Sequence, residues 1–351
     1  MTVATAKPAR SRRRGAPREP AEPRALPVLS RHAEHSSVFL TLNRETLHYR
    51  APDIDGLIAY RPAGRRHLIQ LCGPIAAPAD RDALVRSFLN WAREQNQHVM
   101  AIQLTRSEAQ QYARLGFVAN QIGSSYSIDL DRFSLRGTKF FRLRNKISRA
   151  TRLGVTVHEL SPLDLQQPQS SGELAGIDAE WLRAKGRHVK ELTFLIGERD
   201  GRGAPYRRIF VARHEGRAIA YVTYSPVFGS RAGWLYDLTR RHPSSPPGTV
   251  ELIFSAVVEK LRSEDYHWLH LGLTPFVGLA DEHELDYGAS PVVRKLVRAL
   301  SEHGQAIYPA SAQLAFKMKW GPQVIEPEYV AFQQAASLQG VWHLMRLTRA
   351  I

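Results

Sequence analysis

The chain has little cysteine and no long apolar segment. Its 351 residues include a single cysteine, Cys72, so no disulfide can form within the chain. No zinc-ligand spacing occurs, and His267 and His270 would lie on opposite faces of a strand, which favours packing over metal binding. No apolar run approaches the ~20 residues that cross a bilayer, and no apolar segment follows the N-terminal arginines as in a secretory signal. These absences predict a cytoplasmic protein with no transmembrane segment and no metal site.

Acidic residues are missing from residues 136–152, which read RGTKFFRLRNKISRATR and carry seven Lys or Arg side chains. At helical spacing the stretch forms two adjacent stripes, an apolar one of Phe140, Leu143, Ile147 and Ala150 and a basic one of Lys139, Arg142, Lys146 and Arg149. This pattern predicts an amphipathic helix. A solvated helix face usually mixes both signs of charge, so the pattern favours a ridge that binds nucleic-acid phosphate or an acidic membrane surface. A plain solvated helix is the alternative.

The net charge of +15 is concentrated in two places. The basic stretch contributes seven positive charges, and the first 31 residues, with eight basic residues against two glutamates, contribute six. The rest of the chain is nearly neutral, which favours a dedicated polyanion site. Residues 1–30 are rich in Pro, Arg and Ala without periodicity and are predicted to be disordered. This tail is either a solubilising segment or a basic arm that adds attraction to phosphate.

Helical and strand patterns alternate on both sides of the basic stretch. Before it we expect strands at 56–60, 67–72, 98–104 and 123–130, and helices at 80–95 and 107–115. After it we expect strands at 155–159, 192–196, 208–213, 218–225, 234–238, 268–273 and 312–318, and helices at 172–185, 249–263 and 291–302. The order, with a Leu115-Gly116-Phe117 turn after the second helix, resembles the GNAT acyltransferase fold. The predicted class is α/β (α+β), with tandem GNAT-like domains at 31–135 and 154–351 joined by a basic linker helix at 136–153.

Four motifs follow one another along the chain: residues 134–153 (SLRGTKFFRLRNKISRATRL), 237–240 (DLTR), 270–275 (HLGLTP) and 316–322 (FKMKWGP), the last followed by Glu328 and Tyr329. They resemble the C-terminal catalytic domain of lysyl-phosphatidylglycerol synthases, whose pattern runs S-L-K-G-K-x-x-R-x-L-R, D-L-M-R, N-L-G-M-A-P-L and F-K-x-K-F-x-P-x-W-x-x-x-Y. The resemblance covers most of residues 120–332. Each motif alone is weak, but four in this order are fairly specific. Thr239 and His270 replace the family's Met and Asn, and the sequence has no counterpart of the family's transmembrane flippase.

The resemblance assigns roles to particular residues. Asp237 and Arg240 match the acid and the base of D-L-M-R, Glu251 falls where the family has an acidic residue at the start of the next helix, and Lys317 and Lys319 match the late lysines. It implies catalytic roles for Asp237, Arg240, Glu251 and Lys317, and tRNA contacts for Arg136, Lys139, Arg142, Arg144, Lys146, Arg149 and Lys319. The alternatives are a structural ion pair between Asp237 and Arg240, and a solvated strand edge for the two lysines, which would share one face of a strand.

These residue types suit transfer from an aminoacyl ester. The ester is already activated, so a hydroxyl can attack it directly while the site positions both reactants and stabilises the oxyanion. A cation such as Arg240 or Lys317 suits the oxyanion or the terminal tRNA phosphate, and a carboxylate such as Asp237 or Glu251 suits the α-ammonium or the proton of the nucleophile. The resemblance therefore implies a transferase whose donor partner is aminoacyl-tRNA.

The acceptor stays open between two kinds of hydroxyl. A membrane lipid such as phosphatidylglycerol is the family's usual acceptor, and the apolar residues 273–280 (LTPFVGLA) offer a peripheral contact with a membrane, although a buried loop is the simpler interpretation. The missing flippase favours a small diffusible hydroxyl or hydroxylamine in natural-product biosynthesis. Free-standing relatives of antibiotic pathways, such as the seryl transferase of valanimycin biosynthesis, are similar in this respect.

Two other classes compete with this interpretation: a CoA-dependent N-acetyltransferase and a non-catalytic RNA- or membrane-binding protein on an acyltransferase scaffold. Enzymes of the first class hold the CoA pyrophosphate with backbone N–H groups of a Gly-rich loop at a helix N-terminus. Here the corresponding residues 241–248 read RHPSSPPG, and prolines remove several of those donors. The sequence therefore disfavours CoA and predicts no cofactor.

Overall fold

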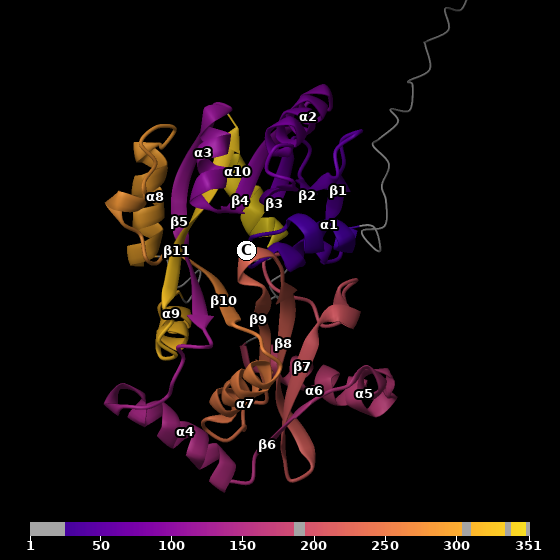
Figure 1. Ribbon diagram of the computed structural model, residues 1–351, viewed down its shortest axis with the longest axis vertical. Helices are drawn as coiled ribbons and strands as arrows, with labels where there is room; N and C mark the ends of the chain where they lie inside the picture. Colours follow the sequence, from indigo (N-terminus) through magenta and orange to yellow (C-terminus); the bar gives the residue numbers. More distant parts are fainter. Residues whose placement is uncertain (1–24, 186–193, 304–309, 334–337, 349–351) are drawn as a thin grey trace, which may run out of the picture.

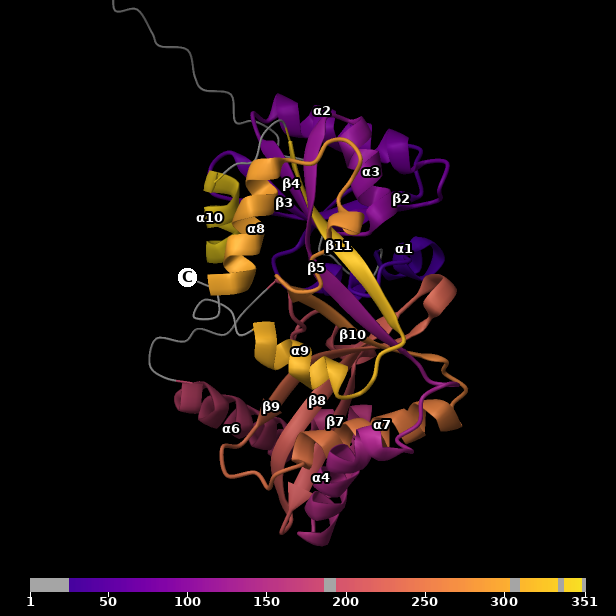
Figure 2. The ribbon, with the colours of Figure 1, turned by 90° about the vertical axis from the view of Figure 1, so that its left-hand side faces the viewer.

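The strands of the molecule form one continuous mixed sheet. The computed structural model describes residues 25–185, 194–303, 310–333 and 338–348. The strand order is β1-β2-β3-β4-β11-β5-β10-β9-β8-β7-β6, and helices cover both faces (Figures 1 and 2). Neighbouring strands are antiparallel except for the pairs β3–β4 and β9–β10. The α/β class expected from the sequence is confirmed.

The strands are β1 (Leu47–Tyr49), β2 (Gly56–Ala63), β3 (His67–Ala76), β4 (His98–Leu104), β5 (Phe117–Asp129), β6 (Thr156–Glu159), β7 (Arg208–His214), β8 (Arg217–Val227), β9 (Gly233–Arg241), β10 (Trp268–Pro275) and β11 (Val324–Gln333). The α-helices are α1 (Ala25–His32), α2 (Arg81–Glu94), α3 (Arg106–Arg114), α4 (Phe141–Arg152), α5 (Pro162–Gln166), α6 (Pro168–Lys185), α7 (Thr249–Ser263), α8 (Pro291–His303), α9 (Ala310–Met318) and α10 (Leu338–Leu347). Short 3-10 helices are η1 (Val38–Leu42), η2 (Thr138–Phe140), η3 (Ala204–Tyr206), η4 (Gly229–Arg231) and η5 (Asp281–His283).

The sheet has two halves, which the pairing of β5 with β10 joins at its centre. The first half contains β1 to β5 and β11, and the second contains β6 to β10. Although β11 comes last in the chain, it pairs with both β4 and β5, and β10 pairs with the other edge of β5. Backbone hydrogen bonds therefore run without a break from one half to the other.

Side chains alternate along the strands and build a separate core on each face. On β3, Leu68 belongs to the core under α2 and α3, whereas its neighbour Ile69 belongs to the core under α8 and α10. On β7 of the second half, Phe210 packs toward α4 and α7, and its neighbour Ile209 packs toward α6. This period of two is what a sheet covered on both faces requires.

Three expectations about local structure are wrong. Residues 312–318 form part of α9 and not a strand. The strand was predicted because Phe316, Met318 and Trp320 alternate with polar residues, a pattern that here occurs at the end of a helix. Of the expected strand at 192–196, residues 194–196 form a bend, and 192–193 lie outside the described residues. Residues 25–30, expected to be disordered, lie in α1, which packs Val28 and Leu29 into a core of its own with β2 and β3.

Candidate functional site

Asp237 is a buried carboxylate of β9 with a complete set of partners. It accepts hydrogen bonds from the backbone N–H of Gly197 at 2.5 Å and from the hydroxyl of Ser225 at 2.6 Å, and it pairs with Arg207 at 3.7 Å. Its side chain is 3% exposed. Burial, the largest influence, raises the pKa of Asp237, against the effect of Arg207 and both hydrogen bonds.

Arg240 lies on the same strand but has a different carboxylate partner. Its Nε is 3.7 Å from Asp178 of α6, and its guanidinium stacks 4.0 Å from the ring centre of Trp181 on the same helix. Asp178 also accepts a hydrogen bond from Tyr221 of β8. Asp237 and Arg240 therefore belong to two separate buried networks: Asp237 pairs with Arg207, and Arg240 fixes α6 to the sheet.

Glu251 contacts two other residues singled out from the sequence. It lies in the first turn of α7, where Lys319 donates a hydrogen bond to it at 3.0 Å and Lys146 of α4 is 3.6 Å away. The two lysines outweigh the burial of Glu251 and lower its pKa. Gly248, which precedes the helix, has φ +93°, and a Cβ there would lie 2.1 Å from the carbonyl oxygen of Lys146. Close contact between α4 and α7 therefore creates this group of charges.

Lys317 points away from Lys319, into the sheet. From the last turn of α9 its Nζ donates to the carbonyl oxygens of Gly272 (2.7 Å) and Leu273 (2.9 Å), and only 6% of the residue is exposed. Gly272 has φ +69° and follows a register shift between β10 and β5, a bulge that turns these carbonyls toward α9. Burial lowers the pKa of Lys317 to about 7. The shared strand face expected for the two lysines is wrong, because α9 is a helix.

Glu328 is a buried carboxylate whose charge interacts with Lys317. The sequence indicated it only as the residue that follows the last motif. Its Oε1 lies 3.5 Å from Nε2 of His35, and burial raises its pKa while the charges of His35 and Lys317 lower it. Arg207, Asn43 and His35 were not expected near any site, because no local pattern distinguishes them from other polar residues.

The basic helix is formed but begins later than expected: residues 138–140 form the 3-10 helix η2, and α4 runs from Phe141 to Arg152. Leu143 and Ala150 are buried, Phe140 and Ile147 are partly buried, and the opposite face is exposed. Six of the seven cationic side chains of residues 136–152 lie on the surface: Arg136, Lys139, Arg142, Lys146, Arg149 and Arg152. Arg144 instead donates to the carbonyl oxygens of Leu135 and Gly137 and stabilises the turn before the helix. Within the part of the chain that the structure describes, Arg136, Arg142, Arg149 and Arg152 form no ion pair.

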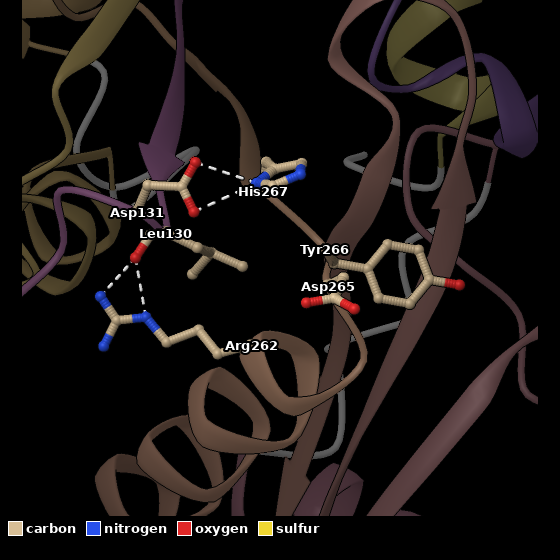
Figure 3. Close-up of a pocket in the computed structure, with 6 residues that line it drawn as sticks. All are labelled: Leu130, Asp131, Arg262, Asp265, Tyr266 and His267. Atoms are coloured by element: carbon tan, nitrogen blue, oxygen red, sulfur yellow. Dashed lines mark hydrogen bonds and ion pairs between the residues drawn. The ribbon is translucent and has the colours of Figure 1, made fainter.

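A shallow pocket of about 270 Å³ opens between the end of β5 and the start of β10 (Figure 3). None of the candidate site residues described above lines this pocket. Its exposed rim carries an ion pair between Asp131 and His267 at 2.9 Å, and Arg262 donates to the carbonyl oxygen of Leu130. His270, by contrast, is buried between the hydroxyl of Ser127 (2.8 Å) and the carbonyl oxygen of Arg231 (2.9 Å), and burial lowers its pKa to about 4.

The described residues contain neither a metal-binding group nor a membrane-spanning helix. Among them, no group of three or more His, Cys, Asp or Glu side chains is arranged to hold a metal ion. None of the helices in the same part of the chain is long and apolar enough to span a membrane.

The fold and the order of the motifs place the chain in a known class. Residues 27–332 match the family model described as phosphatidylglycerol lysyltransferase, C-terminal, so the chain belongs to that family. It is 24% identical over 296 residues to the phosphatidylglycerol lysyltransferase of Bacillus subtilis, covering 83% of this chain and 32% of that protein. It is also 24% identical over 301 residues to the lysylphosphatidylglycerol biosynthesis bifunctional protein LysX of Mycolicibacterium gilvum, covering 83% of this chain and 27% of that protein. The match thus spans between a quarter and a third of the length of these relatives.

The solved structure of L-PGS from Bacillus licheniformis has the same fold. The two chains superpose with a TM-score of 0.78 at 22% identity, over 96% of this chain and 99% of the other. This likeness and the mixed sheet covered by helices on both faces confirm the α/β fold expected from the family resemblance.

Proposed function

We propose that the chain transfers an aminoacyl group from charged tRNA to a hydroxyl of a lipid headgroup of the phosphatidylglycerol type. The observation that carries the proposal is the buried amine of Lys317, at a motif position of the family to which the chain belongs. The sequence alone favoured a small hydroxyl or hydroxylamine acceptor. The relatives matched above are named for phosphatidylglycerol, which favours the lipid.

Lys317 has the properties of a proton carrier. A neutral amine has two N–H bonds and one lone pair, and the two carbonyl oxygens of Gly272 and Leu273 accept both N–H bonds. The lone pair then remains to accept a proton. A pKa of about 7 suits this role, because a general base works best when its pKa is close to the working pH.

The proposed reaction is a direct displacement. The oxygen of the acceptor hydroxyl bonds to the carbonyl carbon of the aminoacyl ester, and its proton passes to Lys317. The bond from that carbon to the terminal ribose oxygen of the tRNA then breaks, and the ribose oxygen takes the proton from Lys317. No covalent enzyme intermediate is needed, because the ester is already activated.

The basic face of α4 is the proposed contact for the tRNA. Its exposed arginines continue into the group formed by Lys146, Glu251 and Lys319, which carries a net charge of +1 beside the positive N-terminal end of α7. Glu251 orients both lysines, and the group suits a phosphate near the acceptor end. Asp237 and Arg240, which are held in buried networks, support β9 in this proposal and do not meet the tRNA.

A CoA donor fits this arrangement poorly. Its pyrophosphate would have to bind at the N-terminus of α7, where Gly248 is in close contact with α4 and Glu251 adds a negative charge.

The first experiment supplies the protein with tRNA charged with single radiolabelled amino acids, lysine first, and with phosphatidylglycerol vesicles or cell extract. We expect loss of ester-linked label from the tRNA and its appearance in the organic phase. The Lys317→Met variant should lose this activity, and Lys295→Met on the exposed surface of α8 serves as the matched control. Label recovered only in the aqueous phase as a new ester would shift the acceptor to a small molecule. No discharge with any amino acid would contradict tRNA as the donor.

A second experiment tests the ridge on α4. Arg142→Ala together with Arg149→Ala should weaken tRNA binding and reduce the slope of log K against log salt by about 0.9 for each phosphate that the protein no longer neutralises. Arg65→Ala together with Arg66→Ala, in the exposed turn between β2 and β3, removes the same charge far from α4 and should leave the slope nearly unchanged. Equal slopes for both double variants would rule the ridge out.

A further inference from the structure

Asp237 belongs to a closed ring of polar contacts that joins the two halves of the sheet. On β9 it accepts from the backbone N–H of Gly197 and pairs with Arg207. Arg207 donates through a terminal nitrogen to Oδ1 of Asn43 at 2.9 Å, and Asn43 donates through Nδ2 to the carbonyl oxygen of Ile196 at 2.7 Å. Because Ile196 and Gly197 are consecutive, the ring closes. Asn43 precedes β1 in the first half of the sheet, whereas Asp237 lies in the second.

The ring is shielded from water. Asn43 is fully buried, and the side chain of Arg207 is 1% exposed. A buried ion pair adds little net stability, since desolvation offsets the attraction, but removing one partner leaves the other charge buried and uncompensated. The value of such a ring lies in the one geometry that satisfies all its members.

Residues 194–207, here called the bridging segment, cross between the halves. Phe194 is buried in the core under α8 and α10, and Ile196 packs into the core under α6. Phe194 has φ +72°, a costly conformation for an aromatic residue that its surroundings have to hold in place. The guanidinium of Arg61 on β2 stacks 4.9 Å from the centre of its ring. The first half of the sheet therefore holds Phe194, and the second half holds Ile196 two residues later.

We infer that Asp237 is a positioning residue that fixes the bridging segment between the two halves through Gly197 and Arg207. The loop after β10 links this role to Lys317. Phe276 in that loop packs against the same core as Phe194. Gly272 and Leu273, whose carbonyl oxygens hold Lys317, lie four and three residues earlier on β10. Loosening the bridging segment displaces the partners of Lys317 without removing any group that touches the reactants. The catalytic part of this inference rests on the proposed function, whereas the ring itself does not.

Hydrogen exchange of the full chain tests the ring directly. In Asp237→Asn, peptides from residues 194–207 should exchange at least about tenfold faster, because Arg207 loses its counter-ion. Asn43→Ala keeps the ion pair and should give a smaller increase in the same peptides, which keeps the test valid if the first variant folds poorly. Asp131→Asn removes an exposed carboxylate and serves as the control. Unchanged exchange at 194–207 in both ring variants would overturn the inference.

A rescue experiment separates positioning from direct contact with substrate. Adding Asn43→Asp to Asp237→Asn places a carboxylate on the other side of Arg207, with loss of the hydrogen bond that Nδ2 of Asn43 donates to Ile196. The double variant should regain at least about tenfold in kcat over Asp237→Asn, with the KM and the pH profile of the wild type. The reason is that leaving the buried Arg207 without a counter-ion costs more than a factor of ten. If Asp237 instead bound the substrate's ammonium group, a carboxylate at position 43 could not replace it. Restored exchange without restored kcat would therefore show that Asp237 touches the reactants. If the wild type transfers nothing, the proposed function fails while the exchange result still decides the ring.

Discussion

Lys317 shows how a single buried group couples stability to pH. Its amine has a pKa of about 7 in the folded chain and its ordinary, higher value when unfolded. Between these values the unfolded chain binds the extra proton, so the free energy of unfolding rises with pH from about 7 to about 10.4. Below pH 7 both states are protonated, and the full cost of the buried charge is present.

We expect Lys317→Met to lack this rise. Urea unfolding of the wild type and the variant at pH steps from 6 to 10 measures it: the variant should be more stable at pH 6, and the difference should shrink as pH increases. The transfer rate of the wild type should also increase through about pH 7, because the neutral amine is the active form. A difference in stability that is constant across this range would contradict a lowered pKa for Lys317.

Cys72 is a second residue whose chemistry follows from burial. It is 1% exposed, and its Sγ lies 3.6 Å from Nδ1 of His35. Burial, and to a lesser degree the charges of Glu108 and Glu328, raise the pKa of the thiol, so it stays protonated and unreactive. A thiol reagent should modify no cysteine in the folded protein and one after denaturation in urea. Rapid modification of the folded chain would indicate that this part of the first half opens easily.

At the scale of elements, the contact between α4 and α7 depends on one glycine. Gly248 and Gly154 both have positive φ, but a Cβ on Gly154 would meet no atom within 4 Å, whereas one on Gly248 would meet the Lys146 carbonyl. Gly154→Ala should therefore cost about 1 kcal/mol of unfolding free energy, for the backbone conformation alone. Gly248→Ala should cost about 3 kcal/mol or more, since α4 has to move as well.

Urea unfolding of both variants distinguishes the two effects. Equal losses of stability would mean that the conformation of the glycine matters and its proximity to α4 does not. An increase in exchange confined to α4 and α7 in Gly248→Ala would support the contact.

The sequence predicted those elements whose apolar pattern is complete within a short stretch. The stripe of Phe140, Leu143, Ile147 and Ala150 specifies α4 by itself, and Leu84 and Phe88 specify α2 in the same way. Other features depend on residues far away in the chain. The ion pair of Arg207 with Asp237 joins different parts of the sheet, and β11 follows its partner β4 by more than 200 residues. No local period in the sequence carries such information. The assignment of Glu251 and Lys317 to the site rests on the family resemblance and stays a prediction.

At the scale of the whole molecule, the pairing of β5 with β10 joins the two halves, and β11 holds β5 in the first half. On β11, Tyr329 and Ala331 complete the core under α2 and α3, while Val330 and Phe332 complete the core under α8 and α10. Without it, β4 and β5 would expose unpaired edges at the centre of the sheet. Because β5 also pairs with β10, we expect disruption at β11 to reach the second half through β5.

We expect Tyr329→Ala to destabilise both halves together. Tyr329 is fully buried, and truncating a buried aromatic residue costs about 3–5 kcal/mol. Pulse-labelled hydrogen exchange at stepped urea concentrations measures the result, with peptides from β3 reporting on the first half and peptides from β8 on the second. The two midpoints should coincide in the wild type and fall equally in the variant, while Leu163→Ala, on the exposed surface of α5, should shift neither. A fall confined to β3 would mean that the halves fold separately, in which case the ring around Asp237 would be the principal tie between them.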